Sequence, residues 1–257
     1  MYKFLYIILG IILFGCTNEQ LDEGIDTSLP EGFGGISMKT LSVNVEERTI
    51  ESRAGDDLSN GKVTFINEDG SEEITKKLSE VQGKVIPLPA KSTPYHFIIS
   101  IGENPEADWD SPYAQGKSEN FIVENKRVTE ITQKISCSPS NILITVEFDD
   151  DLYKIINRSE TSVIIGHEGG SSFLTFGLND IITPGYTPER KAYYKYIEGK
   201  NYLIATLITE IEGNTVTLVS KIEDLKAGHS RNIKYYLKSI SRKADYTQAI
   251  TVTQSDL

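Results

Sequence analysis

A two-residue alternation of apolar and polar side chains recurs along most of this chain and constrains its fold more than any other feature. It is clearest in NILITVEF (141–148) and NIKYYLK (232–238). In the first segment Ile144 and Val146 fall on one face and Thr145 on the other. Shorter runs of this kind occupy 36–45, 62–66, 95–101, 120–123, 128–135, 163–165, 172–176, 216–220 and 249–253. Because side chains alternate across a strand and not along a helix, the pattern predicts an all-β fold.

The composition of these runs and of the gaps between them indicates the kind of β fold. Val, Ile, Thr, Tyr and Phe dominate the runs, as is usual in strands. Turn-forming residues separate them, for example in NEDG (67–70), EGN (212–214) and KAG (226–228). The segment NYLIATLITEIEG (201–213) is apolar on both faces, which fits a buried strand or a short helix, and its β-branched residues favour a strand. Short strands with frequent turns predict antiparallel β-sandwiches.

The best candidate for a domain boundary is SCSPSN (136–141), where small polar residues and Pro139 separate two strongly alternating runs. It divides the chain into two predicted sandwich domains of comparable size, 34–138 and 139–257.

The N-terminus has the pattern of a secretory signal. Lys3 precedes an uncharged stretch, 4–15, of about 12 residues, which as a helix would reach only ~18 Å and is too short to span a bilayer of ~30 Å. The sequence Leu13-Phe14-Gly15-Cys16 resembles a bacterial lipobox, although Phe14 is bulkier than usual. The resemblance implies cleavage between Gly15 and Cys16 and lipidation of the Cys16 thiol. The alternative is an ordinary signal peptide, 1–15, with a cysteine near its cut site.

Residues 16–33 are polar, acidic and aperiodic, so we expect a flexible tether. The acidic residues Glu19, Asp22 and Glu23 resemble the surface-export signal of Bacteroidetes lipoproteins, and an ordinary solvated linker is the alternative. Thr17 is not the aspartate associated with retention at the inner membrane. Several acyl chains would hold the protein at the membrane essentially permanently.

Charge excludes two classes of partner. The formal net charge is -11, and removal of 1–15 takes away only Lys3 and makes it -12. An acidic surface repels nucleic acid phosphates and anionic lipid headgroups, so neither is an expected ligand. With Cys16 lipidated, Cys137 is the only remaining cysteine and has no disulfide partner, and we interpret it as a small buried residue.

Motifs for catalysis or metal binding are scarce. The histidines are isolated from one another and from cysteine, without the spacing of a zinc site: His96, His167 and His229. No nucleophile elbow or phosphate-binding loop occurs, and GHEGGSSF (166–173) fits a hairpin loop. The acidic clusters 149–151 and 108–110 could bind Ca²⁺ or supply glycosidase carboxylates, but solvated turns explain them better. We predict no catalytic residues, no metal site and no cofactor.

Two aromatic residues are candidate ligand contacts. Trp109 and Tyr113 lie in the polar stretch ADWDSPYAQG (107–116). Exposed aromatic rings on loops can stack on a sugar or a partner. The alternative is that Trp109 caps one end of the hydrophobic core, which we favour.

Several segments together resemble a family of fimbrillin-like surface lipoproteins of Bacteroidetes that carry a domain of unknown function. They are the lipobox, GGISMKTLSV (34–43), ESRAGDD (51–57), the long stretch from Ser111 to Leu152, and LKAGHSRNIKYYLK (225–238). The resemblance implies Greek-key, transthyretin-like β-sandwich domains and no enzymatic activity.

Fimbrillins are cleaved after an arginine near the first strand, and the groove left by that strand accepts a strand from a neighbour. Arg53 is the better positional match and Arg48 the other candidate, both in VEERTIESRAGDD (45–57), where an unprocessed charged loop is the alternative. The C-terminal AITVTQSDL (249–257) would be a final or donated strand.

The sequence therefore predicts a non-enzymatic lipoprotein anchored by its lipid in the outer membrane and facing the cell exterior. Its expected role is structural or adhesive, as a fimbrial subunit or anchor whose partners are other fimbrillin-like subunits. A glycan-binding lipoprotein of a nutrient uptake system, with surface glycans as ligands, is the alternative function.

Overall fold

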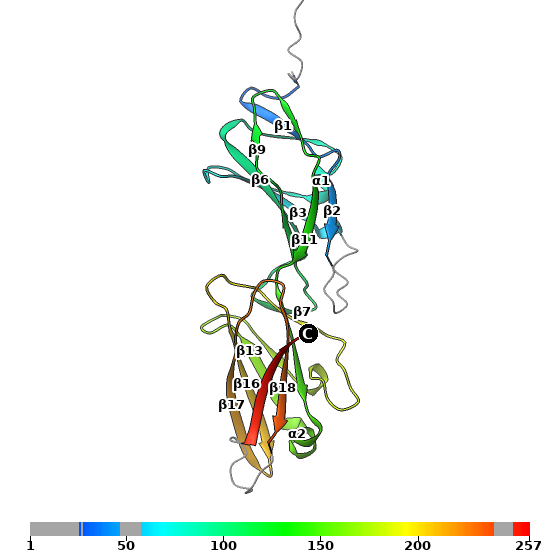
Figure 1. Ribbon diagram of the computed structural model, residues 1–257, viewed down its shortest axis with the longest axis vertical. Helices are drawn as coiled ribbons and strands as arrows, with labels where there is room; N and C mark the ends of the chain where they lie inside the picture. The colour runs from blue at the N-terminus through cyan, green and yellow to red at the C-terminus, as the bar shows by residue number, and fades with distance from the viewer. Residues whose placement is uncertain (1–25, 27, 47–57, 239–248) are drawn as a thin grey trace, which may run out of the picture.

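The computed structural model describes residues 26, 28–46, 58–238 and 249–257 (Figure 1). Its regular structure is almost entirely β, as the alternation predicts, and it forms an elongated molecule with one group of sheets above the other (Figure 1). We call these groups the N-terminal body and the C-terminal body.

The N-terminal body contains a three-stranded sheet in the order β10-β1-β5 and a seven-stranded sheet in the order β2-β11-β8-β6-β3-β4, with β9 paired to β6. Its strands are β1 (Phe33–Ser37), β2 (Ser42–Val45), β3 (Lys62–Asn67), β4 (Glu73–Lys77), β5 (Val85–Pro89), β6 (Lys91–Ile101), β8 (Ala114–Lys117), β9 (Phe121–Val123), β10 (Val128–Glu130) and β11 (Lys134–Pro139).

The C-terminal body contains a five-stranded sheet in the order β19-β18-β12-β15-β7 and a four-stranded sheet in the order β14-β13-β16-β17. Its strands are β7 (Ala107–Trp109), β12 (Ile142–Phe148), β13 (Ser162–Gly166), β14 (Phe173–Phe176), β15 (Ala192–Tyr194), β16 (Leu203–Ile211), β17 (Asn214–Ile222), β18 (Ser230–Leu237) and β19 (Ile250–Asp256).

Each body has its own hydrophobic core. One cluster of buried residues, which includes Phe65, Phe97 and Leu88, lies in the N-terminal body. The other, which includes Phe148 and Phe176, lies in the C-terminal body. The two cores are separate, as the predicted domains 34–138 and 139–257 require, but those limits stay a prediction.

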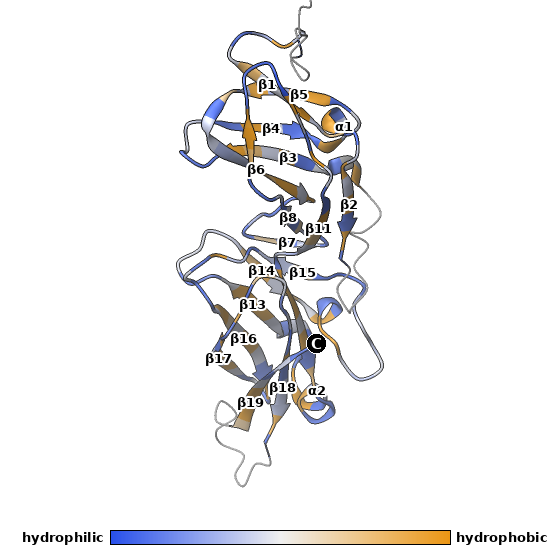
Figure 2. Ribbon diagram, turned by 45° about the horizontal axis from the view of Figure 1, so that its top comes forward, coloured by the Kyte–Doolittle hydropathy of each residue, from blue (hydrophilic) through white to orange (hydrophobic). Residues whose placement is uncertain are grey.

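Alternation along the strands produces these cores. In β16, a segment that is apolar on both faces, every second residue from Leu203 to Ile211 is buried, and the strand interpretation of 201–213 is confirmed. Figure 2 shows hydrophobic colour on strands of both bodies, for example on β1 and β5 and along β16. Burial of one such side chain contributes about 1.5–3 kcal/mol.

Most strand pairs are antiparallel, but three are parallel. They are β1 with β10, β2 with β11, and β12 with β18. Each joins strands that are far apart in the sequence, because a parallel pair needs a long crossover. A period of two gives the faces of a strand but not its neighbour, so the alternation could not predict these pairs.

The short helices are α1 (Leu78–Val81), α2 (Asp150–Ile155) and the 3-10 turns Leu58–Asn60, Arg158–Glu160 and Leu178–Asp180. The acidic run 149–151, which we interpreted as a solvated turn, instead begins α2. The Asp149 carboxylate accepts a hydrogen bond from the Leu152 N–H at 2.9 Å and caps the helix.

Candidate functional site

A loop of the N-terminal body forms part of the C-terminal body. Strands β6 and β8 are an antiparallel pair in which Ile101 lies opposite Ala114. The residues between them, 102–113, leave the seven-stranded sheet, and β7 within them pairs with β15 at the edge of the five-stranded sheet. We call residues 102–113 the strap. The chain thus passes between the bodies at the strap as well as at the short link from β11 to β12.

Backbone hydrogen bonds hold both ends of β7. The Lys195 N–H donates to the Glu106 carbonyl oxygen at 3.1 Å, and the Asp110 N–H donates to the Lys191 carbonyl oxygen at 2.8 Å. The Asp110 carboxylate accepts a further bond from the Lys191 N–H at 2.8 Å. The neighbouring Asp108 carboxylate accepts from the Trp109 N–H at 2.8 Å. The two carboxylates of the cluster 108–110, which we considered as Ca²⁺ ligands, therefore accept hydrogen bonds from backbone amides.

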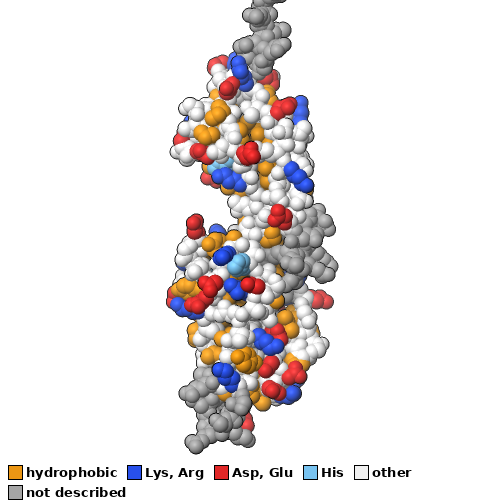
Figure 3. Space-filling view, in the orientation of Figure 1, with side chains coloured by type: hydrophobic (Ala, Val, Ile, Leu, Met, Phe, Trp, Pro, Cys, Tyr) orange, Lys and Arg blue, Asp and Glu red, His pale blue; other side chains and the backbone are white. Residues whose placement is uncertain are grey.

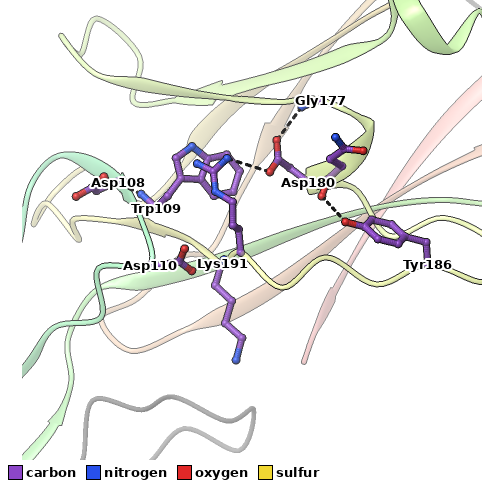
Figure 4. Close-up of polar contacts among 9 residues, drawn as sticks. Asp108, Trp109, Asp110, Gly177, Asp180, Tyr186 and Lys191 are labelled. Atoms are coloured by element: carbon purple, nitrogen blue, oxygen red, sulfur yellow. Dashed lines mark hydrogen bonds and ion pairs between the residues drawn. The ribbon is translucent and has the colours of Figure 1, made fainter. Parts of the chain in front are cut away.

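Trp109 anchors the strap to the C-terminal core. Its ring, labelled in Figure 4, lies edge to face with Phe176, with 4.9 Å between the ring centroids. The Arg190 guanidinium lies 4.1 Å from the Trp109 ring centroid. Arg190 is fixed in turn by Asp180, with 3.3 Å between Nη1 and Oδ1. A guanidinium over an indole face contributes about 0.5–1 kcal/mol at an exposed site. Trp109 is half-buried and packs against the core, as the capping interpretation expects.

The loop after β14 supports this arrangement. The Asp180 carboxylate accepts from the Gly177 N–H at 3.2 Å, and the Tyr186 hydroxyl donates to the Asn179 carbonyl oxygen at 2.9 Å (Figure 4). Tyr186 is 45% exposed and is more exposed than the other two aromatic rings of this region, Trp109 and Phe176.

Tyr113, the second predicted ligand contact, lies on the N-terminal body. Its hydroxyl is 3.4 Å from Oε1 of Gln115 in β8, and burial raises its pKa. Trp109 and Tyr113 thus contact different bodies. Their role in ligand binding stays a prediction.

Glu106, which the sequence analysis left without a role, also tethers the strap, and His167 bonds Lys195, whose N–H holds one end of β7. The Glu106 carboxylate accepts hydrogen bonds from the N–H and the hydroxyl of Ser171, at 3.2 and 2.8 Å, and these bonds lower its pKa. His167 is buried, and its Nε2 lies 2.9 Å from the Lys195 carbonyl oxygen. Burial lowers the pKa of His167, and its Nδ1 has no hydrogen-bond partner. The one sequence signal near these contacts was GHEGGSSF (166–173), which we interpreted as a hairpin loop. That signal does not identify Glu106 as its partner.

The first two strands fill the region that the fimbrillin resemblance singles out. Strand β1 lies between β5 and β10, and β2 lies at the edge of the seven-stranded sheet against β11. Their connection buries Ile36, Met38 and Leu41. The predicted cleavage and lipidation residues Gly15 and Cys16, and the predicted processing residues Arg48 and Arg53, lie outside the described residues.

The remaining candidates show no reactive arrangement. Cys137 is buried, and desolvation raises the pKa of its thiol to about 11. Among the described residues no group of three or more His, Cys, Asp or Glu could hold a metal ion. Nor does the described part of the chain contain a helix with the length and hydropathy to cross a membrane.

Fold and site together define a class of protein, an elongated all-β chain with two cores that are joined by a strap. Within this class, the chain belongs to the family described as "Domain of unknown function (DUF4493)", whose model matches residues 33–256. No curated protein matches it.

Several solved structures are similar to this chain at low sequence identity. A fimbrial assembly protein from Parabacteroides distasonis is 10% identical with a TM-score of 0.44, over 87% of this chain and 96% of that one. A candidate cell adhesion protein from Bacteroides eggerthii is 10% identical with a TM-score of 0.42, over 89% and 96%. A candidate polysaccharide binding protein from Bacteroides thetaiotaomicron is 11% identical with a TM-score of 0.39, over 79% and 92%. Similarity at this level does not transfer a function to this chain.

Proposed function

We propose that this protein is a non-enzymatic lipoprotein of the outer membrane, displayed on the cell exterior, with a structural or adhesive role. The predicted lipid site at Cys16 and the acidic tether precede an elongated β structure that the strap braces. Such an arrangement suits a module held away from a membrane. The proposed mechanism is assembly by strand exchange with other fimbrillin-like subunits.

The observation that carries the mechanism is the position of β1. This strand is hydrogen-bonded on both sides, by β5 and by β10, and its Ile36 is fully buried. It lies N-terminal to Arg53, so a cut there would separate it from the rest of the chain. A central strand on the removable side of a candidate cleavage site is what strand exchange requires.

Loss of β1 would leave an unfilled apolar groove. Ile86 and Leu88 of β5 are buried and lie opposite Ile36 and Gly34 of β1. Fully burying one such side chain contributes about 1.5–3 kcal/mol. Because the groove would also expose the unpaired edges of β5 and β10, it would favour capture of a new strand.

Two glycines set the shape of an acceptable strand. A Cβ at Gly34 would lie 2.2 Å from the Glu124 carbonyl oxygen, and one at Gly35 would lie 2.7 Å from Cγ1 of Val85. An incoming strand needs small residues there or a movement of the Glu124 loop. The C-terminal strand offers Ala249 before the alternating Ile250 and Val252, in the way that Gly35 precedes Ile36 and Met38. Gln248 then falls at the position of Gly34, so this strand would require the Glu124 loop to move.

Strand β19 is also weakly held, which suits a donated strand. Among the described strands it pairs with β18 alone, and of its residues Ile250 alone is buried. Its attachment therefore depends mainly on ladder hydrogen bonds, whose net contribution is about 0.5–1.5 kcal/mol each.

The test is cleavage with an arginine-specific protease followed by electrophoresis of unheated samples. We expect ladders of polymer that disappear in Arg53→Ala and persist in Arg48→Ala. A wild-type chain that is cut after Arg53 and stays monomeric would contradict strand exchange. Protease shaving of intact cells tests the exterior location independently, since a protein inside the outer membrane is protected.

The glycan-binding alternative has less support. Arg190 covers the indole of Trp109 and Phe176 packs against it, which leaves less of the ring for stacking on a sugar. Tyr113 contacts the other body, so the two rings do not point to one shared platform.

A further inference from the structure

The strands that end the described sheets differ in how well their free edges are protected. Natural sheets protect an open edge by making the strand short or by placing proline or charge on it. Six edge strands follow this rule. β2, β7, β10 and β14 have three or four residues, β5 contains Pro87 and Pro89, and β4 carries Glu73, Lys76 and Lys77.

The exceptions are β17 and β19. They have nine and seven residues, contain no proline, and are uncharged from Asn214 to Ser220 and from Ile250 to Ser255. Threonine and valine, which favour strands, make up four of the seven residues of the first stretch and three of the six of the second. Each strand is paired on one side only, β17 with β16 and β19 with β18.

These two edges lie on the same side of the C-terminal body. The Gln254 side chain of β19 accepts from the Glu223 N–H at 3.2 Å and donates to the Lys221 carbonyl oxygen at the end of β17. We call this side the β17/β19 edge. Figure 3 shows the visible surface over β16 and β17 as mainly uncharged and partly apolar, whereas charged side chains of both signs occur elsewhere on the molecule.

We propose that the β17/β19 edge pairs with the same edge of a second copy of this chain. Val219, 61% exposed, is the most exposed apolar side chain on the edge, and the exposed Thr217 lies two residues away on the same face. Because this edge is uncharged, the same edge of a second copy can approach it without a local like-charge contact. Two copies, each with a net charge of -11, repel one another over most of their surface but not along this edge.

The symmetry of such a dimer fixes the relative orientation of its two copies. Two identical free edges meet about a two-fold axis, and continuous sheets then require β17 to run antiparallel to its counterpart. In Figure 1 the N-terminal body extends from one end of the C-terminal body. Antiparallel pairing therefore points the two N-terminal bodies away from each other. If the chain is lipid-anchored, which rests on the proposed function, the pair links copies on facing surfaces.

The contact is small. Nine residues at ~3.4 Å per residue give an edge roughly 30 Å long on a sandwich ~10 Å thick, which is a few hundred Å² and below the ~800 Å² per partner of a standard interface. We expect a weak dimer, with a dissociation constant in the micromolar range. Many such contacts between two surfaces would act together and raise the overall avidity.

Sedimentation velocity of the chain from Thr17 onward, which keeps every described residue, tests the dimer. We expect reversible dimers between 1 and 100 μM at about neutral pH. Val219→Lys and Thr217→Lys should each raise the dissociation constant at least about tenfold, because a lysine on a free edge blocks pairing. Ile122→Lys, which adds the same charge at an exposed apolar residue of the N-terminal body, is the matched control and should leave dimers unchanged.

A wild-type chain that stays monomeric at 100 μM would overturn the proposal, and so would dimers that persist in both lysine variants. Orientation is tested with donor and acceptor dyes on Ile122→Cys. Antiparallel pairing predicts negligible energy transfer between the N-terminal bodies, and strong transfer would overturn the geometry. These measurements use the uncut chain, in which β19 stays paired with β18. A failed dimer therefore does not contradict strand exchange after cleavage, and a failed strand exchange does not contradict the dimer of the uncut chain.

Discussion

The guanidinium of Arg190 lies 4.1 Å from the ring centroid of Trp109, and the two residues come from different parts of the chain. Trp109 belongs to a loop between strands of the N-terminal body, and Arg190 precedes β15 of the C-terminal body. Their contact marks the place where one body completes the sheet of the other. The strap is therefore expected to couple the stabilities of the two bodies.

Trp109→Ala should loosen this coupling. Removing a half-buried indole is expected to lower the free energy of unfolding by about 2–3 kcal/mol, less than for a fully buried tryptophan. Chemical denaturation measures the loss, and limited proteolysis in the strap should become faster. Arg190→Gln removes the stacking contact and the ion pair with Asp180, and it should cost less than Trp109→Ala, about 1 kcal/mol. Equal losses in the two variants would show that Trp109 packing does not anchor the strap.

His167 should make the junction sensitive to acid. Burial lowers the pKa of His167 below the ordinary histidine value of about 6.5, so the unfolded chain binds a proton first as the pH falls. The associated stability is present above pH ~6.5 and decreases as the pH falls below this value. The nearby Glu106 opposes the shift and Lys200 supports it. Thermal unfolding between pH 5 and 8 should show a steeper loss for the wild type than for His167→Gln, whose amide can still donate to the Lys195 carbonyl oxygen. Identical pH profiles would contradict a buried neutral imidazole.

Gly34→Ala should destabilise the intact chain through β1. The added Cβ would lie 2.2 Å from the Glu124 carbonyl oxygen, and the forced movement is expected to cost about 1–3 kcal/mol. Gly177→Ala is the matched control, because the nearest atom to its Cβ is Oδ2 of Asp180 at 3.9 Å. Differential scanning calorimetry of both variants measures the difference. If cleavage after Arg53 releases β1, the processed Gly34→Ala protein should equal the processed wild type, and a persisting defect would show that β1 stays in place.

Cys137 should be inert in the folded chain. Its buried thiol, with a pKa raised to about 11, is almost entirely protonated at neutral pH, and thiolate is the reactive form. In the chain from Thr17 onward it is the only cysteine. Alkylation followed by mass spectrometry should therefore be slow in buffer and fast in denaturant. Rapid labelling of the native protein would indicate that the N-terminal core opens readily around β11.

The sequence by itself determined many of the strands and their faces. It did not identify β4, β8 or β15, and it placed β1 and β2 in one run, 36–45. Alternation in segments such as 141–148 depends on which residues avoid water, and that preference belongs to each residue and its neighbours along the chain. The same reasoning identified the β-strand at 201–213, where β-branched residues decided between strand and helix. It also placed Cys137 among buried residues.

Only the tertiary structure decided how distant segments meet. The parallel partner of β12, the insertion of β7 beside β15, and the contacts of Glu106 with Ser171 join residues that are far apart in sequence. A period of two carries no information about such neighbours, because pairing depends on the summed packing of both strands and on the route of the chain between them. From the sequence we therefore interpreted the stretch around Trp109 as a polar loop. In the structure it pairs with β15 of the C-terminal body and forms an edge strand.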